Sequence, residues 1–115
     1  MLTTPITLYR QGNATSPRMD HVRANKDIAI FEDSGVTWVL ANLSDGRSPG
    51  GISTFTNPGI GKNWWKLDVG CALPIELKLL NDHGNHWLWQ PSQIMTIDSY
   101  QSALKMVGAL FIKID

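Results

Sequence analysis

The chain has 115 residues, 43% of them hydrophobic, and its ten basic and ten acidic side chains cancel. This length and apolar content suit one domain with its own core, so we expect residues 1–115 to fold as a single domain. The balanced charge argues against nucleic acid as a partner, and no apolar run approaches the roughly 20 residues of a membrane helix, so we expect no membrane partner either.

The predicted elements, taken in chain order, are mostly strands. Ser16-Pro17 permits a short helix or an ordered loop, and Asp33-Ser34-Gly35 predicts a hairpin turn. Two connections are predicted at residues 42–51 and 56–74, the second long enough to form an ordered binding loop. Short apolar runs bounded by Gly, Pro, Asn and Asp predict strands at residues 5–10, 27–32, 36–41, 52–55, 76–80, 85–90 and 109–114.

A helix is predicted to follow the sixth of these strands. Thr96 suits its N-cap, Asp98 its first turn and Gly108 its end. Its apolar stripe consists of Ile97, Tyr100, Leu104 and Val107. The pattern as a whole indicates an α+β fold with a small mixed β-sheet core and few helices.

Three predicted strands carry a polar residue on an apolar face: Arg10, Ser53 and His86. An unpaired buried polar group costs on the order of a few kcal/mol, so each of the three needs a partner. A shared cleft would supply partners for all of them.

The same segments resemble the toxin domain of type VI secretion exported effector two. The matching pieces, in the same order, are Leu8-Tyr9-Arg10, 50–55, 73–78, 86–91 and 95–104. The resemblance implies an ADP-ribosyltransferase-like fold and NAD as substrate. It also implies a bacterial toxin that acts in the cytoplasm of a target cell. Antibacterial members of that family are held inactive by a cognate immunity protein.

From this resemblance we expect an NAD-dependent ADP-ribosyltransferase or an NAD glycohydrolase with an unidentified cytosolic target. An immunity protein or antitoxin is the expected partner. The first five residues lack a basic region followed by an apolar stretch, so we expect no secretion signal. Delivery by a type VI secretion system or an intracellular toxin–antitoxin role would both place the action in a cytoplasm.

Candidate NAD-binding residues come from the first two strands of the cleft. Arg10 would bind a phosphate or a ribose-linked oxygen, or else form a salt bridge to Glu32 or Asp68. Gly50 and Gly51 allow close backbone approach to a ligand, or merely form a turn. Ser53 would orient a hydroxyl of the nicotinamide ribose.

The candidate catalytic residues are His86, Ser53 and Glu76. His86 could bind the ribose or polarise the reacting centre, or serve as a structural hydrogen-bonding residue. Loss of nicotinamide leaves positive charge on the ribose, which a carboxylate stabilises. Glu76 precedes the His86 strand and is the first candidate for this role, with Glu32 the second.

Aromatic and histidine pairs offer further interpretations. Trp64 and Trp65 on the predicted loop could stack on the nicotinamide ring. They could instead anchor a protein or a sugar, which would make the chain a non-enzymatic binding module. His83 and His86, preceded by Asp82, could form a metal site, but the two histidines lack a third fixed ligand in the sequence, so we expect none.

Overall fold

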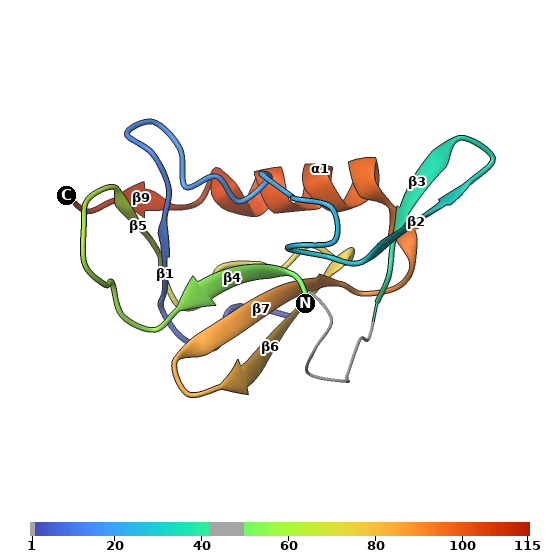
Figure 1. Cartoon of the computed structure of the whole chain (residues 1–115). Coiled ribbons are helices and arrows are strands. Elements are labelled where there is room, and N and C mark those ends of the chain that lie inside the picture. Colours follow the sequence, from blue (N-terminus) through green and yellow to red (C-terminus); the bar gives the residue numbers. More distant parts are fainter. Residues whose placement is uncertain (1, 42–49) are drawn as a thin grey trace.

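The computed structural model describes residues 2–41 and 50–115, which form two antiparallel sheets and one helix (Figure 1). The larger sheet has the strand order β6-β7-β4-β1-β5-β9, and the smaller sheet has the order β2-β3-β8. The α+β class is confirmed. The elements are β1 Leu8–Gln11, β2 Ile30–Asp33, β3 Val36–Val39, β4 Ile52–Phe55, β5 Trp64–Leu67, β6 Leu77–His83, β7 His86–Pro91, β8 Met95–Thr96, α1 Ile97–Gly108 and β9 Ile112–Lys113.

Helix α1 begins and ends where the sequence predicts. The Thr96 hydroxyl caps it by accepting a hydrogen bond from the backbone N–H of Ser99 at 3.2 Å. Its buried face includes Tyr100, Leu104 and Val107, and it packs along one face of the larger sheet (Figure 1). The buried Tyr100 hydroxyl donates to the carbonyl oxygen of Trp89 at 2.5 Å, which ties the helix to β7. Within the described residues, no helix has the length and apolar content needed to span a membrane.

The core lies between α1 and the larger sheet. Leu8 of β1 and Leu67 of β5 are directly paired, and both are fully buried. Trp89 is fully buried as well, and its indole N–H donates to the Thr54 hydroxyl at 3.0 Å. Because side chains alternate along a strand, the face of β7 that carries Trp89 lies opposite the face that carries His86. Trp89 therefore packs in the core with Tyr100 of the helix, away from the face that carries His86.

The predicted connection at 56–74 is wrong over Trp64–Leu67, which form β5. This strand lies between β1 and β9, so both of its edges are paired, and Trp64 and Leu67 are buried on its opposite faces. Burial on both faces removes the polar–apolar alternation by which a strand is recognised in a sequence.

Two other predicted segments have different outcomes. Ser16-Pro17 does not begin a helix: the chain there is an ordered loop, and Arg18 adopts a positive φ of 57°. The predicted connection at 42–51 lies outside the described residues except for Gly50 and Gly51.

Candidate functional site

Arg10 reaches from β1 to three backbone carbonyl oxygens. Its Nη1 donates to Ser53 at 2.7 Å, its Nε to Pro17 at 2.9 Å and its Nη2 to Arg18 at 3.2 Å. Burial of the guanidinium lowers its pKa, and the charge of Asp27 opposes that shift. The planar fork therefore fastens the 17–18 loop to β4 and still has N–H groups to spare, because a guanidinium carries five.

The alternative of a salt bridge from Arg10 to Glu32 or Asp68 is not what the structure shows. Glu32 accepts a hydrogen bond from the Thr37 hydroxyl in the smaller sheet, at 2.6 Å. Asp68 forms an ion pair with Lys66 at 3.3 Å.

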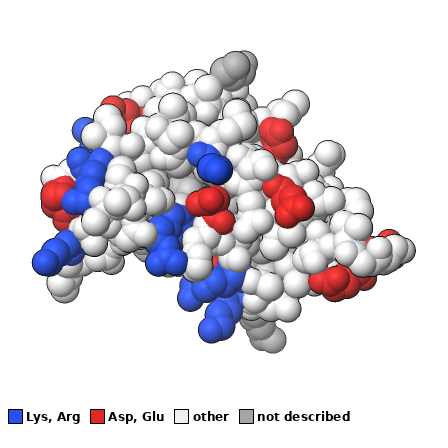
Figure 2. All heavy atoms as spheres, turned by 90° about the horizontal axis from the view of Figure 1, so that it is seen from above, with Lys and Arg blue, Asp and Glu red and all other residues white. Residues whose placement is uncertain are grey.

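A polar cavity of about 300 Å³ lies between β1, β4 and the loop that joins β1 to β2. Its lining carries three arginines, one histidine and one carboxylate, so its charge is positive, which suits a phosphate-bearing ligand. In Figure 2 the Lys and Arg side chains lie in the left half and the centre, with acidic ones among them, whereas the charged side chains in the right half are mostly acidic. The lining residues are Arg10, Gln11, Gly12, Arg18, His21, Arg23, Asp27 and Ser53.

Arg23 and Asp27 form an ion pair on the rim of this cavity. The Asp27 carboxylate accepts from Nε of Arg23 at 3.1 Å, from Nη2 at 3.0 Å and from the backbone N–H of Arg23 at 2.8 Å. Burial tends to raise the pKa of Asp27, but these hydrogen bonds and the charges of Arg23 and Arg10 outweigh it and lower the pKa. The carbonyl oxygen of Asp27 also accepts from the N–H of Gly51 at 2.7 Å. The loop is thus closed onto β4.

Ser53 and His86 meet on the other face of β4. The Ser53 hydroxyl oxygen lies 2.8 Å from Nε2 of His86, and the two residues come from neighbouring strands, β4 and β7. Nδ1 of His86 lies 2.6 Å from a carboxylate oxygen of Asp82 at the end of β6. Phe55 packs beside the imidazole, with ring centroids 5.3 Å apart. The result is a hydrogen-bonded chain from Asp82 through His86 to Ser53.

The structure therefore links Arg10, Ser53 and His86, but from two sides of β4. The Ser53 carbonyl accepts from Arg10, and the Ser53 hydroxyl faces His86. The register explains the two sides, because Tyr9 pairs with Phe55, which places its neighbour Arg10 on the opposite face from Phe55 and His86. Ser53 contacts both Arg10 on one side of β4 and His86 on the other.

The two glycines before β4 have structural roles of their own. Gly51 has a φ of +134°, and a Cβ there would lie 2.1 Å from the carbonyl oxygen of Trp89. The backbone at Gly51 thus approaches β7 so closely that only glycine fits. Gly50 forms a bridge with Ile28, and a Cβ at Gly50 would lie 3.0 Å from the Leu88 side chain.

The structure does not bring Glu76 to Ser53 and His86. The backbone of Glu76 bonds to Ser92, just beyond the far end of β7. His86 opens that strand and Pro91 ends it, so about 17 Å separate the two ends at the usual rise per residue. Glu32 lies in the smaller sheet, away from the cavity.

Trp64 is buried rather than exposed, with 7% of its surface accessible. It packs edge-on against Phe55 of β4, with ring centroids 6.5 Å apart. Phe55 in turn contacts the imidazole of His86. Trp65 is half-buried, and its indole N–H donates to the carbonyl of Asn13 at 3.0 Å. The expectation of two adjacent exposed tryptophans on a loop is therefore wrong, and with it the surface on which the binding-module alternative depends.

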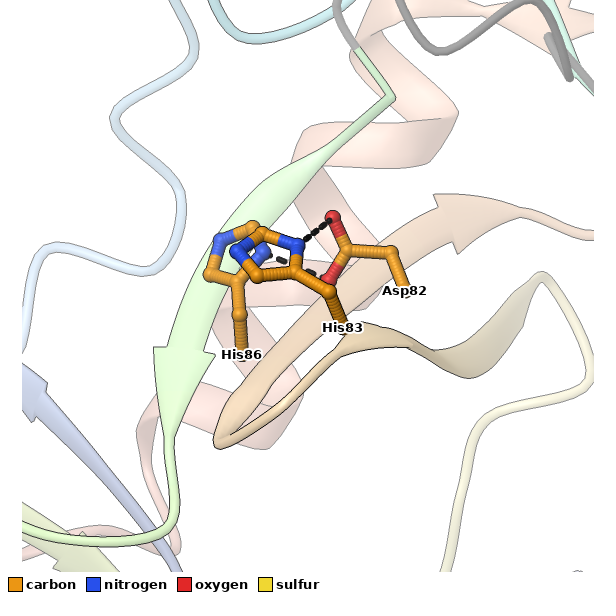
Figure 3. A group of neighbouring side chains, drawn as sticks. All are labelled: Asp82, His83 and His86. Atoms are coloured by element: carbon orange, nitrogen blue, oxygen red, sulfur yellow. Dashed lines mark hydrogen bonds and ion pairs between the residues drawn. The ribbon is translucent and has the colours of Figure 1, made fainter.

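Figure 3 shows Asp82, His83 and His86 side by side. Their potential ligand atoms all lie within 4.8 Å of one another. The structure thus supplies the third potential ligand that the sequence analysis found lacking. Both imidazoles, however, already direct Nδ1 at the Asp82 carboxylate, His86 at 2.6 Å and His83 at 3.1 Å. Hydrogen bonding and ion pairing account for this arrangement without a metal ion.

A larger cavity of about 730 Å³ lies elsewhere, under the C-terminal half of α1. Its lining is mostly apolar and includes Leu73, Leu77, Met106 and Leu110. A dinucleotide presents phosphates and hydroxyls, so the smaller polar cavity beside Ser53 is the better match in spite of its size.

The sequence did not reveal the role of several residues that the structure places at the site: Arg18, His21, Arg23, Asp27 and Asp82. The first three were visible as two arginines and a histidine at short spacing in a polar stretch. Asp82 stands four residues before His86, which across a two-residue turn brings the two side chains together.

Comparison with known proteins gives one finding. Residues 6–113 match the family model described as Tse2 ADP-ribosyltransferase toxin, which covers nearly the whole chain. No curated protein and no solved structure gives a significant match.

Proposed function

Because the chain belongs to the Tse2 ADP-ribosyltransferase toxin family, we propose that it is an NAD-cleaving toxin whose site is built around Ser53. In this reaction the bond between nicotinamide and its ribose breaks, nicotinamide leaves, and ADP-ribose passes to an acceptor nucleophile. With water as the acceptor, the same step is NAD glycohydrolysis. The observation that carries the assignment of the site is the 2.8 Å contact between the Ser53 hydroxyl and His86.

The positively lined cavity is the proposed place for the pyrophosphate of NAD. Arg10, Arg18 and Arg23 line it together with a single carboxylate, Asp27, so two negative phosphates would meet a complementary charge. Arg10 uses three of its nitrogens on carbonyl oxygens, yet each terminal nitrogen retains a second N–H. Arg10 would thus hold the loop in place and contact a phosphate.

Ser53 and His86, on the other side of β4 from Arg10, are the proposed groups at the reacting end, so NAD would have to extend from the cavity past β4 to reach both. A ribose hydroxyl bound by Ser53 would place the scissile bond beside the imidazole. The ribose gains positive charge as nicotinamide leaves, so oxygen lone pairs fixed close to it lower the barrier. Gly50 and Gly51 fit this arrangement, since they precede Ser53 and fix the start of β4 against β7.

The proposed biological context rests on the family. We infer a cytosolic macromolecule or metabolite as the ADP-ribose acceptor, action in the cytoplasm of a target cell, and delivery by a type VI secretion system. A cognate immunity protein would protect the producing cell. What supports these inferences is the toxin family to which the chain belongs.

Cytoplasmic expression in a bacterial host tests the proposal. Wild type is expected to arrest growth and to deplete NAD, whereas Ser53→Ala and His86→Ala are expected to relieve arrest, because each removes one side of the 2.8 Å contact. Ser102→Ala, on the exposed side of α1, is the matched control and should remain toxic. The proposal fails if both site variants, folded and expressed at wild-type level, still arrest growth.

A further inference from the structure

Asp82 holds both neighbouring histidines. Its Oδ1 lies 2.6 Å from Nδ1 of His86, and its Oδ2 lies 3.1 Å from Nδ1 of His83. Figure 3 shows both rings turned toward the carboxylate. Burial opposes ionisation of Asp82, but the hydrogen bond from His86 and the closeness of both imidazoles outweigh it and lower its pKa. The group is therefore a carboxylate at neutral pH.

An ionised carboxylate can only accept hydrogen bonds, which fixes the tautomer of His86. Nδ1 of His86 must carry a hydrogen in order to bond to Asp82 at 2.6 Å. In the neutral imidazole, Nε2 is then the acceptor, and the hydroxyl 2.8 Å away donates to it. The hydrogen of Ser53 points at His86, and the lone pairs of its oxygen are left for another group.

The turn itself does not need Asp82. The side-chain amide of Asn81 donates to the carbonyl oxygens of Gly84 and His86, at 3.0 and 2.9 Å, and so closes the hairpin between β6 and β7. Asp82 contributes no hydrogen bond to the backbone of this turn among the described contacts. Its two contacts are both with imidazoles.

We propose that Asp82 is a positioning residue of the NAD-cleaving site, which holds His86 in the Nδ1-protonated tautomer and thereby directs the lone pairs of Ser53 toward the cationic ribose. Negative charge at the end of this chain makes the serine oxygen a stronger electron donor. Asp82 would thus stabilise the positive charge on the ribose indirectly, through His86 and Ser53. Glu76 and Glu32 were the candidates for this role in the sequence. The inference rests on the proposed function, since it concerns the same site.

The test compares purified wild type, Asp82→Asn and the control Asp33→Asn, which alters another hairpin carboxylate, bonded to Ser34 in the smaller sheet. Nicotinamide release from NAD gives kcat and KM. Nitrogen-15 spectra of the imidazole rings report the tautomer of His86. We expect Asp82→Asn to lower kcat about 10- to 100-fold with little change in KM, because it disturbs orientation rather than binding. Asp82→Glu should recover part of kcat, and Asp33→Asn should match wild type.

In wild type the spectra should show His86 protonated at Nδ1, and in Asp82→Asn a population protonated at Nε2 should appear. An active wild type with an equally active Asp82→Asn overturns the role of Asp82 alone. So does a neutral wild-type His86 protonated at Nε2. A wild type that releases no nicotinamide overturns the proposed function as well, which separates the two failures.

Discussion

At the scale of single residues, Ser53 is the junction of the site. Its carbonyl oxygen accepts from Arg10 and its hydroxyl faces His86, so one residue connects the cationic cavity with the histidine chain. The residues just before it are constrained by packing. Gly51 lies so close to β7 that any side chain would overlap the Trp89 carbonyl. The position of Ser53 therefore depends on a glycine two residues away.

Substitution at Gly51 should be much more damaging than at a glycine that only needs its φ. Gly51→Ala places Cβ 2.1 Å from Trp89 O, whereas Gly70, with a φ of +88°, has no neighbour within 4 Å. We expect Gly70→Ala to lower the free energy of unfolding by about 1 kcal/mol, through its positive φ alone. Gly51→Ala should lower it by at least about 2 kcal/mol more. Urea denaturation measures both, and equal losses would refute the packing argument.

At the scale of elements, the loop between β1 and β2 forms one wall of the cavity. Arg10 holds it at Pro17 and Arg18, and Asp27 holds its far end through the hydrogen bond from Gly51. The bond between Arg23 and Asp27 closes the loop on itself. A segment with little regular structure is thus held by the side chain of Arg10, the Arg23–Asp27 ion pair and the backbone bond between Gly51 and Asp27.

This closure predicts a dependence of stability on acid. Arg23 keeps the pKa of Asp27 below the ordinary value of 3.8, so the stabilisation is fully present above pH 3.8 and is lost as pH falls through the lower folded value. Asp27→Asn removes the titrating group and should flatten the fall in unfolding free energy below pH 4. Arg23→Gln should do the same, because it removes the partner. Denaturant unfolding at several pH values tests this. If the unfolding free energy of both variants still falls with acid as steeply as that of wild type, the Arg23–Asp27 ion pair is not its cause.

The elements differ in how far the sequence could predict them. The cap at Thr96, the stripe through Leu104 and the end at Gly108 are local signals, and all three were predictable. β5 was not, because its two covered faces leave no alternation around Trp64 and Leu67. The contact between Ser53 and His86 was predictable as two polar residues in apolar strands. The pairing of His86 with Asp82 depended on the exact turn, which the sequence does not fix.

At the scale of the whole molecule, charge is arranged unevenly on a chain of zero net charge. Cationic side chains line the cavity beside Ser53, while the smaller sheet carries Glu32 and Asp33 on its exposed hairpin. Such an arrangement attracts a dianionic ligand to one place without making the whole surface basic.

The most direct test of the account is nicotinamide release from NAD by purified wild type and His86→Ala, with the folded state of both checked by circular dichroism. We expect release by wild type and a rate at least about 100-fold lower for His86→Ala, because the imidazole lies in contact with Ser53 at the proposed reacting end. Release at the same rate by both proteins, or none by wild type, would contradict it.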